Sequence, residues 1–207
     1  VTLDELGLVI GMSIRATLIE ADKLESAPVT VAVTFTQSDA PDDIDANATK
    51  SVVTVRDVPP GTLVTVYDED GDVLGNAANE EAVPAEVSLT IAAPRLTEGQ
   101  ALDVALTEPR KTVSAKARVN AYYEQSAKLD EERIVANATD NIVTVTGVKP
   151  GATVTVYDAE GDVVLGTGHN AGADDADLAI TPAPPLTAGD AVQVTYTEQY
   201  HRESDPT

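Results

Sequence analysis

Short runs in which apolar and polar residues alternate recur along most of the chain. Because successive side chains of a β-strand point to opposite faces, this period of two predicts strands with one buried face. Turn-forming residues separate the runs, as is typical of a β-sandwich with strands in two packed sheets. The runs are Val53/Val55 and Val143/Val145, Val64/Val66 and Val154/Val156, Leu89/Ile91 and Leu178/Ile180, and Leu102/Val104/Leu106 and Val192/Val194/Tyr196.

Glycine-containing turns lie between these runs, at Asp70-Gly71 and Glu160-Gly161 and also at Pro60-Gly61 and Pro150-Gly151. An Asp-Gly pair suits a type I′ hairpin, because both central residues of that turn need positive φ. We therefore predict hairpin turns at residues 70–71 and 160–161. The valines expected to be buried beside them are Val64, Val66, Val154 and Val156.

The chain contains a tandem duplication. Residues 46–75 match residues 136–166, and residues 96–109 match residues 186–199, both at an offset of 90. A copy of this length can bury a core of its own. We expect an all-β fold with two tandem sandwich domains at residues 26–115 and 116–207. Residues 1–25 would form an extra N-terminal strand and a linker.

A partial third copy lies near the N-terminus, where residues 11–20 repeat the apolar spacing of residues 99–108 and 189–198. If each unit begins at residues 29–35, this strand lacks a sheet of its own. If each unit ends with the equivalent of residues 29–35, the N-terminus carries two extra strands and the second unit lacks its closing strand. An unpaired strand leaves backbone groups unsatisfied, so we expect it to pair with the adjoining domain or, by strand addition, with a neighbouring subunit. The contact residues would be Ile14, Ala16, Leu18 and Glu20.

The pattern P-G-x-x-V-T-V-Y-D-x-x-G-D occurs at residues 60–72 and 150–162, and a Leu-Thr-x-Gly strand ending in Thr-Glu comes after each copy. This pattern resembles the tandem immunoglobulin-like repeats of bacterial cell-surface proteins, including S-layer proteins and adhesins. The resemblance covers most of both copies and implies two tandem immunoglobulin-like β-sandwich domains in a secreted, structural protein. Such repeats serve as spacers, lattice elements and binding modules alike, so it does not select one function.

Acidic residues outnumber basic residues by 35 to 13, which gives a formal net charge of −22. This charge repels nucleic-acid phosphates and anionic lipid headgroups, so neither is expected as a partner. Cysteine is absent from the sequence, so stability depends on packing and backbone pairing without disulfides. Asp4 and Glu5 stand where a signal peptide would carry basic residues, and the apolar stretch beside them is too short to span a bilayer, so membrane insertion is not expected.

The sequence presents no grouping suited to catalysis. His169 and His201 lie in polar stretches without a second histidine or a thiolate nearby, and no serine stands in a Gly-x-Ser-x-Gly setting. We therefore expect a protein that is not an enzyme and needs no cofactor.

The duplicated acidic turns are candidate calcium sites, because Ca²⁺ prefers carboxylate oxygens on a glycine-containing loop. A plain hairpin turn is the alternative, since neither copy has the downstream bidentate glutamate of a calcium loop. The cluster Asp174, Asp175 and Asp177 is interpreted as solvated surface. The candidate ligands are Asp68, Asp70 and Asp72 in the first copy and Asp158, Glu160 and Asp162 in the second.

Asn47 and Asn137 stand at equivalent positions in Asn-Ala-Thr, the acceptor pattern for N-glycosylation. Because both lie inside the duplicated block, their recurrence has a second explanation in the duplication itself. They are candidate glycosylation sites.

Two functions fit these features. The first is a structural subunit of an extracellular, self-assembling filament or surface lattice, with other copies of itself as partner and the N-terminal strand as the connection. The alternative is a stalk or binding segment of a cell-surface adhesin. Both place the protein outside the cell, at the cell surface.

Overall fold

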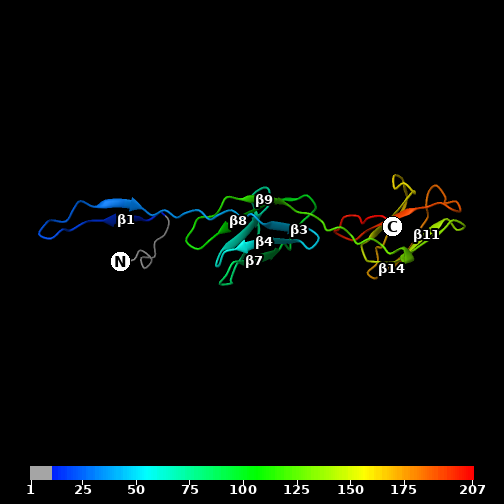
Figure 1. Cartoon of the computed structure of the whole chain (residues 1–207), viewed down its shortest axis with the longest axis horizontal. Coiled ribbons are helices and arrows are strands. Elements are labelled where there is room, and N and C mark those ends of the chain that lie inside the picture. The colour runs from blue at the N-terminus through cyan, green and yellow to red at the C-terminus, as the bar shows by residue number, and fades with distance from the viewer. Residues whose placement is uncertain (1–10) are drawn as a thin grey trace. The chain divides into compact units, whose positions relative to one another are not determined.

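The computed structural model describes residues 11–207 (Figure 1). Within that range the chain consists of strands and loops, and its helical content is one turn of 3-10 helix, η2, at Glu131–Arg133. The described part contains no helix that is both long and apolar enough to cross a membrane. The all-β prediction is confirmed.

The first sandwich contains a three-stranded sheet of order β3-β4-β7 and a four-stranded sheet of order β6-β5-β8-β9. Strand β5 lies centrally in the larger sheet and pairs antiparallel with both β6 and β8, which places Val64 opposite Ala77 on one side and Leu106 on the other. The strands are β3 (Ile44–Asn47), β4 (Val52–Val58), β5 (Leu63–Tyr67), β6 (Val73–Ala78), β7 (Ala85–Thr90), β8 (Ala101–Thr107) and β9 (Ala117–Asn120).

The second sandwich repeats this arrangement in sheets of order β10-β11-β14 and β13-β12-β15. Thr207 exchanges two backbone hydrogen bonds of 3.0 Å with Val194 of β15, where the match between the two copies puts the start of a β9-like strand. The predicted pair of immunoglobulin-like sandwiches is therefore present. The strands are β10 (Ile134–Asn137), β11 (Ile142–Val148), β12 (Thr153–Tyr157), β13 (Val164–His169), β14 (Ala176–Ile180) and β15 (Gln193–Thr197).

The cores are built from the alternating valines. Val64, Val66, Val154 and Val156 are all fully buried, as predicted. Their neighbours along each strand are less buried, so the period of two in the sequence separates the inner face from the outer face. With so few aromatic residues in the chain, these small aliphatic side chains supply most of the buried apolar surface.

The turn type at the acidic hairpins differs from the prediction. Gly71 and Gly161 have φ of +91° and +81°, but neither Asp70 nor Glu160 has positive φ, so these turns are not type I′. The Gly71 amide donates to the Asp68 carbonyl at 3.2 Å, and the register shifts between Val66 and Tyr67. This is a type I turn that ends in a left-handed glycine and a bulge, in which only the glycine needs positive φ.

The N-terminal strand is paired within the chain. Strand β1 (Ser13–Ala16) runs antiparallel to β2 (Val29–Ala32), with Ile14 opposite Val31 and Ala16 opposite Val29. The sequence prediction assigned residues 29–35 to the first sandwich, and the hydrogen bonds instead place β2 beside β1. This pairing satisfies the backbone groups that the two strands turn toward each other.

The same shift occurs at the next boundary. Strand β9 (Ala117–Asn120) lies in the four-stranded sheet of the first sandwich, whereas the predicted boundary at residues 115 and 116 put it in the second domain. The first sandwich therefore ends with the hairpin β8–β9. Alternation reports which face of a strand is buried and says nothing of the neighbouring strand, so it did not predict this pairing.

Packing groups the chain into two compact units. The first comprises the chain up to Ile44, Thr54–Leu89 and Leu102–Val119, and the second comprises Asp45–Val53, Thr90–Ala101 and Asn120–Thr207. The second unit thus contains the whole second sandwich together with two loop-bearing segments, residues 45–53 and 90–101.

Candidate functional site

A polar and aromatic cluster inside the second unit joins residues 45–53 and 90–101 to the loop at residues 198–202; we call it the joint cluster. Its backbone frame is a pair of isolated parallel bridges, Asn47 with Tyr122 and Gln125 with Arg202. In sequence, only Tyr123 and Glu124 separate the two bridged positions 122 and 125. Residues 122–125 are therefore held by backbone pairing at both of their ends.

Thr49 is at the centre of the joint cluster. Its hydroxyl donates to the carbonyl of Tyr200 at 2.8 Å and accepts from the amide of Glu124 at 2.7 Å. One half-buried side chain therefore ties two backbone segments that are far apart in sequence. A hydroxyl can do this because it is both donor and acceptor.

Tyr200 supplies the aromatic part of the cluster. Its backbone adopts a left-handed φ of +61° in the turn after β15. The Arg95 guanidinium lies 4.2 Å from the centre of its ring, and the Tyr123 ring lies 6.5 Å away at 56°. Arg95 also donates to the carbonyl of Thr49. The cation–π contact and the tilted aromatic pair are both attractive geometries.

Glu98 is bonded from two directions. The Arg202 guanidinium reaches it at 2.7 Å, and the backbone amide of Tyr123 donates to it at 2.8 Å. The hydrogen bond from Arg202, and next that from the Tyr123 amide, lower the pKa of the Glu98 carboxyl. The charged form of this carboxylate is therefore the form that holds the cluster together.

Glu124 accepts hydrogen bonds from two further polar side chains of the joint cluster. The Lys50 ammonium and the Asn47 amide each donate to it at 2.7 Å. The hydrogen bond from Lys50, and next that from Asn47, lower the pKa of Glu124, and the same Glu124 bond raises the pKa of Lys50. This carboxylate thus anchors the segment that precedes the second sandwich to the end of β3.

Differences between the two sequence copies carry the signal for this cluster. The core positions are nearly identical between the copies, but Lys50, Arg95 and Glu98 have Asp140, Pro185 and Ala188 at the equivalent positions. The duplication was identified from residues that the copies share, among them Asn47 and Thr49 of the joint cluster, whereas Lys50, Arg95 and Glu98 are residues that the copies do not share.

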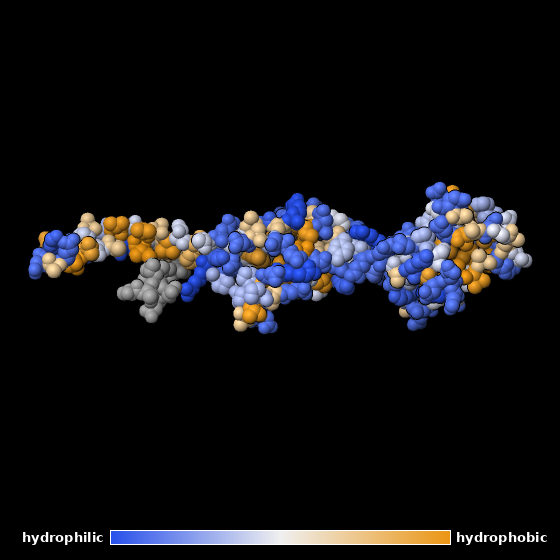
Figure 2. Space-filling model, viewed as in Figure 1, coloured by the Kyte–Doolittle hydropathy of each residue, from blue (hydrophilic) through white to orange (hydrophobic). Residues whose placement is uncertain are grey.

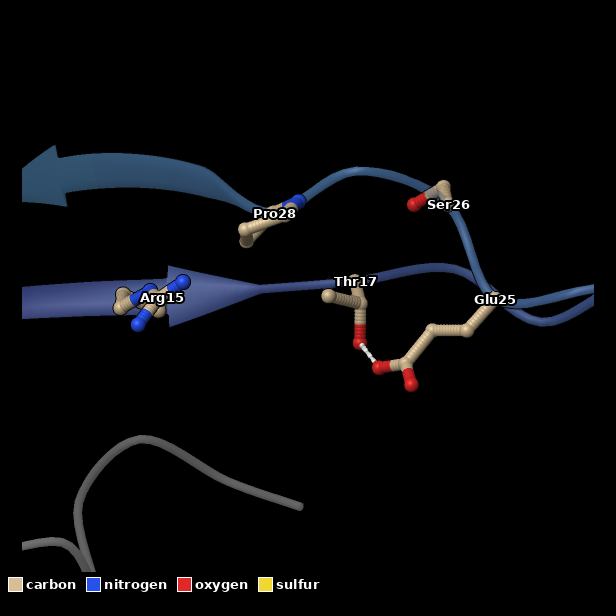
Figure 3. A pocket seen from close by; sticks show the side chains of 5 residues that line it. All are labelled: Arg15, Thr17, Glu25, Ser26 and Pro28. Atoms are coloured by element: carbon tan, nitrogen blue, oxygen red, sulfur yellow. Dashed lines mark hydrogen bonds between the residues drawn. The ribbon is translucent and has the colours of Figure 1, made fainter.

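The predicted contact strand is largely uncovered. Ile14 is half-buried, Ala16 is exposed, and Leu18 is 63% exposed, while Glu20 forms an ion pair with Lys23 next to it. On the other face of the hairpin, a shallow polar hollow is bordered by Arg15, Thr17, Glu25, Ser26 and Pro28, and Thr17 donates to Glu25 across it (Figure 3).

In each acidic turn the first carboxylate accepts hydrogen bonds from backbone amides of the same turn. Asp68 accepts from the amides of Asp70 at 3.1 Å and Asp72 at 2.8 Å, and Asp158 accepts from the amide of Asp162 at 2.9 Å. Among the described residues, no group of three or more acidic, histidine or cysteine side chains is arranged to hold a metal ion. Calcium binding by these turns, including Asp72 and Glu160, stays untested.

The two candidate glycosylation sites differ in exposure. Asn47 is 6% exposed and is bonded to Glu124 and to the amide of Lys50, whereas Asn137 is exposed and bonded to Asp140. The imidazole of His169 lies 3.2 Å from the Thr153 hydroxyl, and the imidazole of His201 lies 3.0 Å from the Gln199 carbonyl. These contacts are local to their turns and strands.

No protein-family model matches the chain, and no curated protein matches it. Similar solved structures include one titled "Biofilm associated protein - BSP domain", which is 23% identical over 81% of this chain and 28% of that one, with a TM-score of 0.31. The FN1–FN3 domains of chicken CNTN1 are 9% identical over 97% of this chain and 76% of that one, with a TM-score of 0.34. The human OSCAR ligand-binding domain is 14% identical over 81% of this chain and 97% of that one, with a TM-score of 0.26. The chain thus spans little more than a quarter of the first of these, and the fold assignment rests on the sheets described above.

Proposed function

We propose that the chain is a spacer segment of an extracellular, cell-surface protein, in which tandem immunoglobulin-like sandwiches set the distance and stiffness between other parts. The observation that carries the proposal is the joint cluster, which replaces a flexible linker by backbone bridges at Tyr122 and Gln125. A spacer needs connections that resist bending more than it needs a ligand pocket. The role is structural, without catalysis or a cofactor.

The charge distribution supports an extracellular setting. A net charge of −22 keeps the surface strongly hydrated and discourages association with nucleic acid or anionic membranes. The absence of cysteine makes the fold insensitive to the redox state of its surroundings. Stability comes instead from the packing of the valine cores.

A second candidate is the self-assembling subunit of a filament or lattice, with other copies of the chain as partner. The exposed apolar face of the β1–β2 hairpin favours it, because an uncovered strand face can add to a neighbour's sheet. A head-to-tail contact of this kind would give an open polymer.

Sedimentation velocity and negative-stain electron microscopy over a wide concentration range separate the two candidates. A spacer segment remains monomeric, and distances measured between spin labels in the second unit stay narrowly distributed. Filaments or sheets that form with increasing concentration would instead support assembly. A broad distance distribution between a label at residue 92 and one at residue 163, both exposed positions outside the joint cluster, would contradict the stiff joint on which the spacer proposal rests.

A further inference from the structure

The β1–β2 hairpin reproduces the backbone of the hairpin that closes the first sandwich. In the first sandwich, Gly99 donates to the Ala121 carbonyl at 2.8 Å and Ala121 donates to the Gln100 carbonyl at 2.8 Å. At the N-terminus, Gly11 donates to the Val33 carbonyl at 3.4 Å and Val33 donates to the Met12 carbonyl at 2.7 Å. The two segments, residues 11–33 and 99–121, have equal length and the same hydrogen-bond register.

The turn inside each hairpin is also the same. A residue with left-handed φ recurs at Asp22, Arg110 and Tyr200, with φ between +61° and +62°. A serine hydroxyl then accepts the amide of the last apolar residue of the strand, at 2.9 Å, 2.9 Å and 3.0 Å in the three copies. These serines are Ser26, Ser114 and Ser204.

One face of the hairpin is apolar and uncovered. Directly opposed residues share a face, so Ile14 and Val31, and likewise Ala16 and Val29, lie on the same side. Val29 and Val31 are 63% and 58% exposed, and Figure 2 shows the apolar residues gathered along this segment. The polar residues Arg15 and Thr30, which are also opposed, alternate with them.

In the first sandwich the equivalent face is core. Leu102 and Val104, the counterparts of Ile14 and Ala16, are fully buried. Strand β5 pairs with the edge of β8 that faces away from β9. Among the described residues, β1 and β2 form a sheet of two strands, so β1 has no such partner at its other edge. The hairpin therefore has the inner face and the free edge of a sandwich without the strands that cover them.

We infer that residues 11–33 are the closing hairpin of a third sandwich, and that its open face binds the strands equivalent to β3–β7 from an adjacent copy of the same repeat. The sequence match continues upstream of the hairpin, where Val1-Thr2-Leu3 aligns with Leu89-Thr90-Ile91 and Leu8 aligns with Leu96. The first sandwich contains these complementary strands within residues 37–91, so this segment of the chain can stand in for the occupant in an experiment.

A graft tests whether this hairpin can close a sandwich. Residues 99–121 of the full chain are replaced by a second copy of residues 11–33, which keeps the length unchanged. We expect the grafted chain to retain two folded sandwiches. We also expect the grafted strand amides to exchange on the order of 100-fold more slowly than the same amides in the N-terminal hairpin, because a covered strand opens only with its core. Unfolding of the first sandwich would overturn the inference.

Two substitutions in the graft test the face. At the grafted position corresponding to Val31, Val→Asp should abolish the protection, whereas Thr→Asp at the position corresponding to Thr30 should preserve it. Equal effects of the two substitutions would overturn the assignment of the inner face.

An extended chain tests the occupant. A copy of residues 36–98 is placed before Gly11 in place of residues 1–10, and the control carries Val→Asp at the added positions corresponding to Val64 and Val66. Amides of β1 and β2 should exchange on the order of 100-fold more slowly in the extended chain than in its control. Equal exchange rates in the extended chain and its control would overturn the proposal. Protection of the unextended hairpin that rises with protein concentration would also overturn it, because the occupant would then be another copy of the chain.

Discussion

Thr49→Val removes the hydroxyl at the centre of the joint cluster while keeping the shape of the side chain. Two hydrogen bonds are lost, one to the Tyr200 carbonyl and one from the Glu124 amide. At a net 0.5–1.5 kcal/mol for each, the loss would be about 1–3 kcal/mol. Thr49 is only half-buried, so water can replace part of each bond, and we expect a decrease of about 1–2 kcal/mol in the free energy of unfolding of the second unit.

Thr139→Val is the matched control, because Thr139 has the equivalent position in the second copy and is exposed. This control should change the free energy of unfolding by less than about 0.5 kcal/mol. Urea unfolding monitored by circular dichroism gives both values, and hydrogen exchange reports whether the Glu124 amide loses protection. The joint cluster is not energetically significant if Thr49→Val and Thr139→Val are indistinguishable in both measurements.

The carboxylates, the core and the acidic turns give three further predictions. The pKa values of Glu98 and Glu124 are lowered in the folded protein, so their contribution to stability is present above the unfolded-state value of about 4.3 and is lost as the pH falls through the folded-state values. In an acid titration at low salt, the amides of the joint cluster should therefore lose their protection from hydrogen exchange before the core amides do. Protection that is lost instead on raising the pH would contradict this. Val154→Ala, at a fully buried position, should lower the free energy of unfolding by about 1–3 kcal/mol, whereas Val163→Ala, at a position 52% exposed, should change it little; calorimetry decides. Because Asp68 is committed to backbone amides, adding calcium or EDTA should leave the melting temperature within about 2 °C, a shift that corresponds to well under 1 kcal/mol; a large shift with EDTA would restore the calcium interpretation.

The fold was predictable because its determinants are local and repeated. Alternation at Val64 and Val66 states which side chains face inward, and its recurrence at Val154 and Val156 confirms that the pattern is not accidental. The turn type was not predicted correctly, since an Asp-Gly pair is compatible both with type I′ and with a type I turn that ends in a left-handed glycine. Only the backbone dihedral of Asp70 distinguishes them.

Strand partners were harder to predict than strands. The segment Val29–Ala32 has the same alternation whether it begins one sandwich or closes another, because the pattern does not depend on which edge carries the hydrogen bonds. The match of residues 11–28 to residues 189–206 already aligns Ser26 with Ser204. The structure gives these serines and Ser114 the same role in the hairpin turn, which the sequence match alone does not state.

The duplication imposes different constraints on the core and on the joint cluster. A core valine has the same place in the sheet in both copies even where its neighbours differ. Val64 lies opposite Ala77 and Leu106, Val154 lies opposite Gly168 and Tyr196, and the valine itself is kept. Arg95 and Glu98 instead contact Tyr200 and Arg202, which come from the other copy, so their usefulness depends on the sequence of the next repeat along the chain. Because these positions can change without disturbing a core, the sequence of the joint cluster can vary separately from the cores of the sandwiches.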